Sequence, residues 1–265
     1  MFSWLKARNG APDARTVLEK TIILRELFVK GLVSPPLDML TKTMEAWGEA
    51  ERNAFNKDCM KQFSDRISRL RELGLWKKMT EEEREFLNAG PLEISRQAMV
   101  DVSWLIESIV CLLWALGYVA ELPPYDEQTD PEMANRLPKE SAETLFTKAS
   151  LRPAHQIRKQ RDIAELWHWR SRTRRLQESG QMPPLPGKGY TIEELISLAS
   201  SKAAEAGDLP APIEKDFPAF GRAYRDISPE EFATATSIAQ ERHRAFNWLC
   251  GLAPGNRWAD TPTDT

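Results

Sequence analysis

Apolar residues recur at helical spacing along almost the whole chain, and no stretch alternates convincingly with a period of two. Proline-rich connectors separate these periodic segments. The pattern predicts an all-α protein with the longest irregular stretches at about 121–139, 179–190 and 208–227. The expected helices cover approximately 12–30, 36–73 (with room for a break near Asn53 to Asn56), 80–88, 91–116, 140–150, 153–178, 191–206 and 229–250.

Helix ends are marked by explicit signals. Thr80, Thr191 and Ser228 are each followed three residues later by glutamate, which is the capping-box pattern. Glycines that follow periodic runs are expected to end helices in a left-handed conformation. These glycines are Gly31, Gly74, Gly117, Gly207 and Gly251.

The stretch from Val102 to Ala120 is nearly apolar over about the length of a membrane span. Glu107 in its middle and Asp101 at its start would be costly in lipid, so we expect a buried core helix instead. The sequence therefore predicts one compact domain over 1–265, of about eight helices around the central helix 91–116, with 229–250 packed on it. Within this domain, 1–11 is expected to be a loose N-terminal extension and 180–227 an enlarged loop-plus-helix insertion.

Composition indicates a soluble globular protein, since 42% of the residues are hydrophobic and 28% are charged. The net charge of −3 provides no basic field for nucleic acid or a membrane, so neither is an expected partner. The three cysteines are scattered, as reduced thiols in a cytoplasmic protein often are. The first residues lack the apolar run of a signal peptide, and we expect a cytoplasmic location.

The helix expected at 229–250 carries two charged residues on its apolar face. Glu241 and Arg242 project into the arc that should face the core, where each charge requires a partner. A polar stripe on the opposite side is expected to face solvent, and it consists of Gln240, His243, Arg244 and Asn247.

The helix expected at 91–116 repeats this feature. Glu107 lies on a face made by apolar and aromatic residues, namely Val100, Trp104, Cys111 and Trp114. Two buried carboxylates on two helices are typical of a Glu–Arg network that orients helices. The alternative is a site that tunes the pKa of each carboxylate by burial and a nearby charge.

The helix expected at 153–178 places Trp167 and Trp169 on nearly opposite sides, which indicates that other elements surround it. A third side forms a basic stripe. One interpretation is a solvated amphipathic face, and the other is a site for an anion, a phosphate or an acidic tail. The stripe consists of Arg158, Arg161, Glu165, His168, Arg172 and Arg175.

Recognisable catalytic and cofactor motifs are missing from the sequence. No two of its three histidines have i,i+4 spacing, and there is no HExxH, GxSxG, Walker or GxGxxG motif. We therefore expect no metal and no cofactor, although His168 and His243 with Glu107 or Glu241 could in principle assemble a metal site from different helices.

Four stretches together resemble one family: WLIESIVCLLWALG, DIAELWHW, ERHRAFNWL and the terminal RWADTPTDT. Through these stretches the chain resembles the bacterial domain of unknown function family 4272. The resemblance implies these motif positions: Trp104, Glu107, Trp114, Asp162, His168, Trp169, Glu241, Arg242, His243, Asn247, Trp248, Trp258, Asp260, Thr263, Asp264 and Thr265.

The chain departs from the family pattern where charged residues would pair. Leu105 and Leu166 stand at arginine positions, and Ala259 and Thr173 stand at acidic positions. These differences put a catalytic role for those pairs in doubt. The family has no agreed activity, so the resemblance implies an architecture and a candidate site without a reaction.

We expect Glu107, Glu241, Arg242 and His168 to converge on one polar network, joined by Asp260 and Asp264 of a terminal segment that folds back. Trp258 should anchor that segment and be substantially buried. Arg161, Asp162, Trp169, Arg172, Asn247 and Trp248 complete the candidate site.

The preferred function is a non-enzymatic partner-binding or accessory protein, of which an immunity or antagonist protein is one form, with another protein as its partner. The alternative is a hydrolase-like enzyme. In it, Glu107 or Glu241 acts as base, His168 or His243 as acid or metal ligand, and Arg242 as anion clamp. A purely structural network explains the buried charges equally well.

Overall fold

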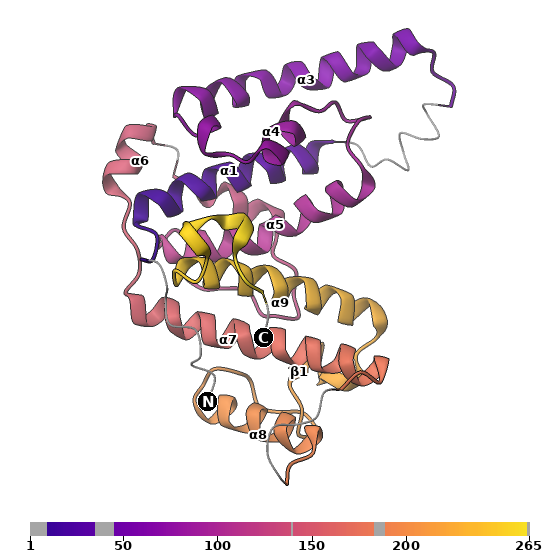
Figure 1. The fold of residues 1–265 in the computed structure, drawn as a ribbon, viewed down its shortest axis with the longest axis vertical. Helices are drawn as coiled ribbons and strands as arrows, with labels where there is room; N and C mark the ends of the chain where they lie inside the picture. Colours follow the sequence, from indigo (N-terminus) through magenta and orange to yellow (C-terminus); the bar gives the residue numbers. More distant parts are fainter. Residues whose placement is uncertain (1–9, 35–44, 139, 183–188, 264–265) are drawn as a thin grey trace. The chain divides into compact units, whose positions relative to one another are not determined.

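The computed structural model of the chain describes residues 10–34, 45–138, 140–182 and 189–263 (Figure 1). Helices dominate the described residues, and the strands are limited to one short ladder, which confirms the all-α class. The helices are α1 (Ala14–Val33), α3 (Glu49–Glu72), α4 (Glu81–Asn88), α5 (Arg96–Ala115), α6 (Ala142–Lys148), α7 (Ala154–Ser179), α8 (Ile192–Glu205) and α9 (Pro229–Leu249). Short 3-10 helices lie at Trp76–Lys78, Pro131–Arg136, Tyr224–Asp226, Pro254–Asn256 and Trp258–Asp260.

The chain forms two compact units. Unit 1 contains residues 1–12, 119–129 and 151–265, and unit 2 contains residues 13–118 and 130–150. The expected packing of 229–250 on 91–116 would join the two units, and it stays a prediction, as does the single domain. Most of the expected N-terminal extension 1–11 lies outside the described residues.

The predicted N-terminal signals are confirmed. Thr80, Thr191 and Ser228 each accept a hydrogen bond from the backbone of the glutamate three residues later, whose carboxylate accepts one in return. These reciprocal bonds satisfy amide groups that would otherwise lack a partner at the start of a helix. They explain why α4, α8 and α9 begin where the sequence indicates.

The predicted left-handed C-terminal glycines are confirmed except for Gly31. This residue lies inside α1, where a Cβ atom would come within 2.5 Å of the Val102 side chain on α5. The glycine therefore permits a close approach of two helices within unit 2 rather than a helix end. The confirmed positions, all with positive φ, are Gly74, Gly117, Gly207 and Gly251.

The segment expected as one helix over 36–73 differs from the prediction. Helix α3 begins at Glu49 after a turn at 45–46, and it continues without a break through Asn53 to Asn56. The Glu51 carboxylate accepts a hydrogen bond from the Gly48 amide at 2.6 Å, which fixes this start. Residues 35–44 of the expected helix lie outside the described residues.

Unit 2 is built on the pairing of α1 with α5. Every residue from Leu105 to Ala115 is buried, including Glu107. Among the described residues, α5 is the helix with the length and apolar composition of a membrane span. Most of it is buried, as is usual for the core helix of a soluble protein.

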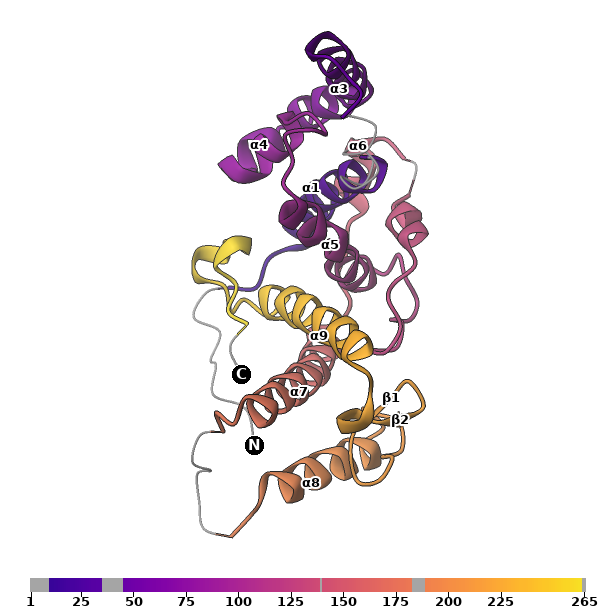
Figure 2. The same cartoon turned by 90° about the vertical axis from the view of Figure 1, so that its right-hand side faces the viewer.

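Unit 1 is built on the pairing of α7 with α9, which lie side by side in Figures 1 and 2. The region expected to be an irregular loop at 208–227 instead contains two tight hairpin turns. Glu214 and Lys215 both have positive φ at the first, and Phe220 and Gly221 do so at the second. The second turn joins the strands β1 (Pro218–Ala219) and β2 (Arg222–Ala223).

Candidate functional site

The seam between α7 and α9 buries two of the three histidines. His243 is fully buried, and His168 is only 6% exposed. The prediction that His243 and Asn247 belong to a solvent-facing stripe is therefore wrong, because α7 covers this side of α9. His168 likewise does not belong to an exposed basic face.

The two histidine rings stack on each other, with centroids 4.8 Å apart and an angle of 23° between the planes. Burial, together with the nearby His168, Arg161 and Arg172, lowers the pKa of His243 to about 3. The His243 ring is therefore neutral near pH 7, and it is a poor proton donor at that pH.

Asn247 connects this histidine pair to two other parts of unit 1. Its Nδ2 donates to the Pro262 carbonyl at 2.8 Å and to His243 Nε2 at 3.0 Å, and its Oδ1 accepts from Arg161 Nε at 3.1 Å. Because both amide hydrogens are used, His243 Nε2 must be the acceptor and Nδ1 carries the ring proton. We call Arg161, His168, His243, Asn247 and Pro262 the Asn247 junction.

Arg161 is held at the junction by further contacts. Its Nη1 donates to the Glu165 carboxylate at 2.5 Å and to the Asp162 carboxylate at 3.2 Å. Asp162 itself is exposed to solvent, whereas the Arg161 side chain is only 11% exposed. The guanidinium is thus fixed in place before any ligand arrives.

The terminal segment folds back onto α9, as predicted. Trp258 is 9% exposed, and its ring packs edge-on against Trp248 at 5.3 Å between centroids. Trp248 Nε1 donates to the Asn256 carbonyl at 2.9 Å, and Thr261 is buried. The described part of the segment, up to residue 263, therefore packs against α9 rather than forming a solvated tail, and Thr265 lies outside the described residues.

Asp260 of this segment does not contribute as predicted. Asp260 forms an ion pair with Arg257 at 2.5 Å, three residues away, and it is exposed. Its expected contact with Arg242, His168 or the basic stripe is therefore wrong, because its local partner lies closer along the turn. Asp264 lies outside the described residues.

Glu241 and Arg242 lie in the buried arc of α9, as predicted. Arg242 donates to the Pro123 carbonyl at 2.5 Å and to Thr129 Oγ1 at 3.4 Å, and its guanidinium lies 4.7 Å from the Tyr125 ring centroid. These contacts attach the 119–129 segment to α9, which is a structural use of the charge.

The predicted carboxylates are placed differently from each other. Glu241 forms an ion pair with Arg244 at 3.2 Å, on the same helix. Glu107 is fully buried on α5 of unit 2, where Trp104 is half-buried. The convergence of Glu107 with Glu241, Arg242 and His168 spans the two units and stays a prediction.

A pocket of about 830 Å³ adjoins the Asn247 junction. Its wall combines α7, α8 and the residues that end and follow α9, and Arg161 belongs to both the pocket and the junction. We call it the arginine-rimmed pocket. Its apolar lining includes Leu151, Ile157, Leu166, Leu249 and Leu252, and its charged lining is Arg152, Arg158, Arg161, Lys202, Asp162 and Asp208.

Cys250 also lines this pocket. Burial raises the pKa of its thiol to about 11, so the thiol is protonated near neutral pH. The thiolate is the nucleophilic form, and the environment therefore does not favour a reactive cysteine.

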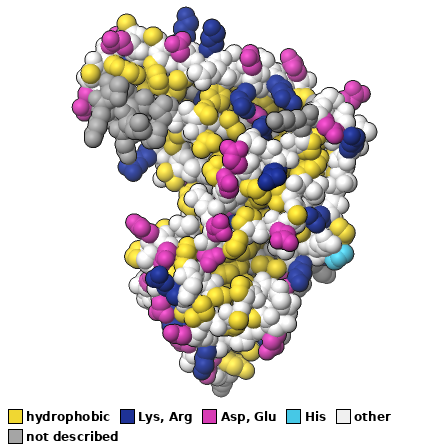
Figure 3. Space-filling view, turned by 180° about the vertical axis from the view of Figure 1, so that it is seen from behind, with side chains coloured by type: hydrophobic (Ala, Val, Ile, Leu, Met, Phe, Trp, Pro, Cys, Tyr) yellow, Lys and Arg dark blue, Asp and Glu magenta, His cyan; other side chains and the backbone are white. Residues whose placement is uncertain are grey.

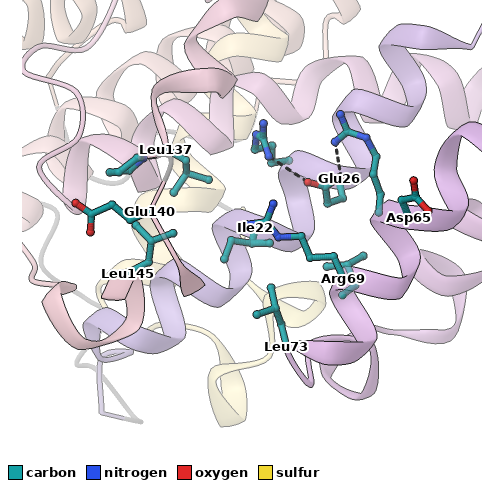
Figure 4. A pocket seen from close by; sticks show the side chains of 12 residues that line it. Ile22, Glu26, Asp65, Arg69, Leu73, Leu137, Glu140 and Leu145 are labelled. Carbon is teal, nitrogen blue, oxygen red and sulfur yellow. Dashed lines mark hydrogen bonds and ion pairs between the residues drawn. The ribbon is translucent and has the colours of Figure 1, made fainter. Parts of the chain in front are cut away.

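Unit 2 contains a different pocket, of about 550 Å³ (Figure 4). The Glu26 carboxylate accepts from Arg25 at 3.1 Å and from Arg66 at 2.7 Å, as the dashed lines in Figure 4 show. The charged lining is completed by Arg69, Asp65 and Glu140, so it contains three basic and three acidic residues. This balanced set does not favour a charged ligand.

A fully buried ion pair in unit 1 was not predicted from the sequence. Arg170 Nε and Nη2 donate to the Asp216 carboxylate at 2.7 and 2.6 Å, and the two side chains are 1% and 2% exposed. The carboxylate also accepts from the amides of Phe217 and Arg225. Arg170 lies three residues after Trp167 on the same helix, and both are buried. Its position on the same face as this tryptophan was the signal in the sequence that Arg170 is buried.

Two other candidate residues lie on α7, and one of them, Arg172, is close enough to His243 to help lower its pKa. Trp169 is half-buried and its ring lies 6.3 Å from Phe217, and Arg172 is half-buried on α7. Among the residues that the structure describes, no group of three or more histidine, cysteine or carboxylate side chains is placed to hold a metal ion.

The fold and the site define a helical protein with a buried polar junction beside an open pocket. Residues 50–193, more than half of the chain, match the family described as "Domain of unknown function (DUF4272)", and the chain belongs to this family. The match includes the Trp104–Gly117 and Asp162–Trp169 stretches, whereas the ERHRAFNWL and terminal motifs lie beyond it. No curated protein and no solved structure matches the chain.

Proposed function

We propose that this chain is a non-catalytic, partner-binding protein of the cytoplasm, and that the arginine-rimmed pocket is its binding site for another protein. An immunity or antagonist protein is one form of this function. One observation supports the proposal most strongly: a large, mainly apolar pocket lies beside groups that are poorly suited to catalysis. His243 is neutral, and the Cys250 thiol is protonated.

The hydrolase-like alternative is less well supported by the contacts of its proposed residues. Arg242 donates to a backbone carbonyl and lies on an aromatic ring, and it does not line the pocket. Glu241 is held by Arg244. A general base or an anion clamp would need to face a space that a substrate can enter.

Binding at the pocket can be measured with 8-anilinonaphthalene-1-sulfonate, an amphipathic anion, titrated into the full chain. Ala199 lines the pocket and is half-buried, so Ala199→Trp should fill the space and abolish saturable binding. Ala233 on α9 is exposed and does not line the pocket, so Ala233→Trp is the matched control and should bind like the wild type. Equal binding by all three proteins, or none, would contradict the pocket assignment.

The same proteins separate binding from catalysis. Carboxyl-ester, phosphate-ester and amide substrates should show no turnover, with or without Zn²⁺, Mn²⁺ or Mg²⁺. Turnover that Glu241→Gln or His168→Gln abolishes in a folded protein would establish the enzyme alternative. A protein partner captured from the native cells should bind wild type and Ala233→Trp, but not Ala199→Trp.

A further inference from the structure

Two cations of the arginine-rimmed pocket form no ion pair with the described residues. Arg158 on α7 and Lys202 on α8 are both exposed, and neither side chain forms an ion pair or hydrogen bond with any residue that the structure describes. Each long side chain can therefore reach a ligand without first breaking an existing contact.

The remaining charges of the pocket are already occupied. Arg152 donates to the Val119 carbonyl at 2.9 Å, and Asp208 forms an ion pair with Lys159 at 2.9 Å. Arg161 is bound to Glu165 and Asp162. Arg158 and Lys202 are thus the positive charges of the lining that remain for a partner.

Neither the face drawn in Figure 3 nor the pocket of unit 2 shows this imbalance. On the face drawn in Figure 3, acidic and basic side chains are interspersed rather than separated by sign. The pocket in unit 2 has equal numbers of both charges. The arginine-rimmed pocket thus has an excess of positive charge in its lining, although the net charge of the chain is −3.

We infer that the arginine-rimmed pocket binds an acidic segment of a protein partner, in which carboxylates flank one bulky apolar side chain. The apolar side chain enters the lining of Leu151, Ile157, Leu166, Leu249 and Leu252, while the carboxylates pair with Arg158 and Lys202. This inference rests on the proposed function and specifies the chemistry of the partner.

The position of the cations favours a protein segment over a small anion. Arg158 and Lys202 stand on two different helices and are both exposed, so they can pair with two separate carboxylates of one segment. An apolar centre with charged, hydrated surroundings is the usual organisation of a protein interface. Charge complementarity at such a rim raises the association rate and makes binding dependent on salt.

Selection of a phage-displayed library of random 12-residue peptides against the full chain tests this inference. The selected sequences should be enriched in aspartate and glutamate next to tryptophan, phenylalanine or leucine. A synthetic, fluorescein-labelled copy of a selected peptide should then bind the double variant Arg158→Glu/Lys202→Glu at least tenfold more weakly than wild type. Its affinity for the wild type should fall as NaCl is raised.

The matched control reverses two exposed charges outside the pocket, with the same change in net charge. Arg175→Glu/Lys77→Glu should bind the peptide like the wild type. Selected peptides without acidic enrichment, or equal binding by the two double variants, would overturn the inference. So would displacement of the peptide by decanoate at a stoichiometry of one, because the site would then belong to a small amphipathic acid.

The Ala199→Trp variant distinguishes a failure of the inferred acidic chemistry from a failure of the proposed binding site. If it abolishes peptide binding while Arg158→Glu/Lys202→Glu does not, the pocket binds a partner and the acidic chemistry is wrong. If Ala199→Trp has no effect either, the proposed binding site fails together with the inference.

Discussion

The amide of Asn247 donates a hydrogen bond to the carbonyl of Pro262 at 2.8 Å, and this bond attaches the terminal segment to α9. The same side chain accepts from Arg161, which lines the arginine-rimmed pocket. Asn247 therefore connects the terminal segment to Arg161 in the wall of the pocket. A structural change in the segment or in the pocket should affect the other through this residue.

Replacing Asn247 with alanine should lower the free energy of unfolding by about 1–3 kcal/mol, because the buried polar groups around it lose their partners. Urea denaturation followed by circular dichroism measures this loss. Asn53→Ala, on the exposed face of α3, is the control and should stay within about 0.5 kcal/mol of wild type. Equal stability of the two variants would show that Asn247 does not hold the segment in solution.

Replacing Trp258 with alanine should destabilise the chain by about 3 kcal/mol, because a buried indole is removed from its contact with Trp248. Arg257→Ala is the neighbouring control, since that side chain is exposed and its one ion pair among the described residues is with Asp260. Trypsin should also cleave the terminal segment faster in Trp258→Ala. Unchanged stability together with unchanged cleavage would contradict the packing of the segment.

The helices were predictable because their ends carry local chemical signals. Thr80, Thr191 and Ser228 form the expected capping boxes, and Glu241 and Arg242 lie in the expected buried arc. These properties depend on residues within one helix, so a single sequence is sufficient to indicate them.

The candidate site was less predictable because its polar residues are buried by a second helix. His243 and Asn247 form a polar stripe, and the composition of that stripe is the same whether solvent or α7 covers it. The hairpin turn at Glu214 and Lys215 likewise lacks the asparagine or glycine that usually marks positive φ. That turn presents Asp216 to Arg170, so the buried ion pair had no complete signal in the sequence.

Stability should depend on the protonation of His243. Its pKa is lowered in the folded state to about 3 from an ordinary value of 6.5, so between these values the unfolded chain binds the extra proton. The free energy of unfolding should therefore fall as the pH decreases from 6.5 toward 3, by up to roughly 1.4 kcal/mol per pH unit from this residue.

Urea denaturation at several pH values measures this slope. His243→Gln keeps an acceptor and removes the titration, so its slope in this range should be shallower than that of wild type. His155 is exposed, and His155→Gln should leave the slope unchanged. A wild-type slope in both variants would mean that His243 is protonated in the folded state at ordinary pH.

Breaking the buried pair of Arg170 and Asp216 should be the most destabilising of these changes. Arg170→Met leaves a buried carboxylate without its counter-charge and should cost about 3–5 kcal/mol. Asp216→Asn in the same chain removes that charge and keeps one oxygen, which can accept from the amide of Phe217 or from that of Arg225, so the double variant should be more stable than Arg170→Met alone. Thermal denaturation of the two single variants and the double variant measures the coupling. Additive losses would show that the two side chains are not paired in solution. We instead expect the double variant to lose less stability than the sum of the two single losses, because each charge is costly only when the other is missing.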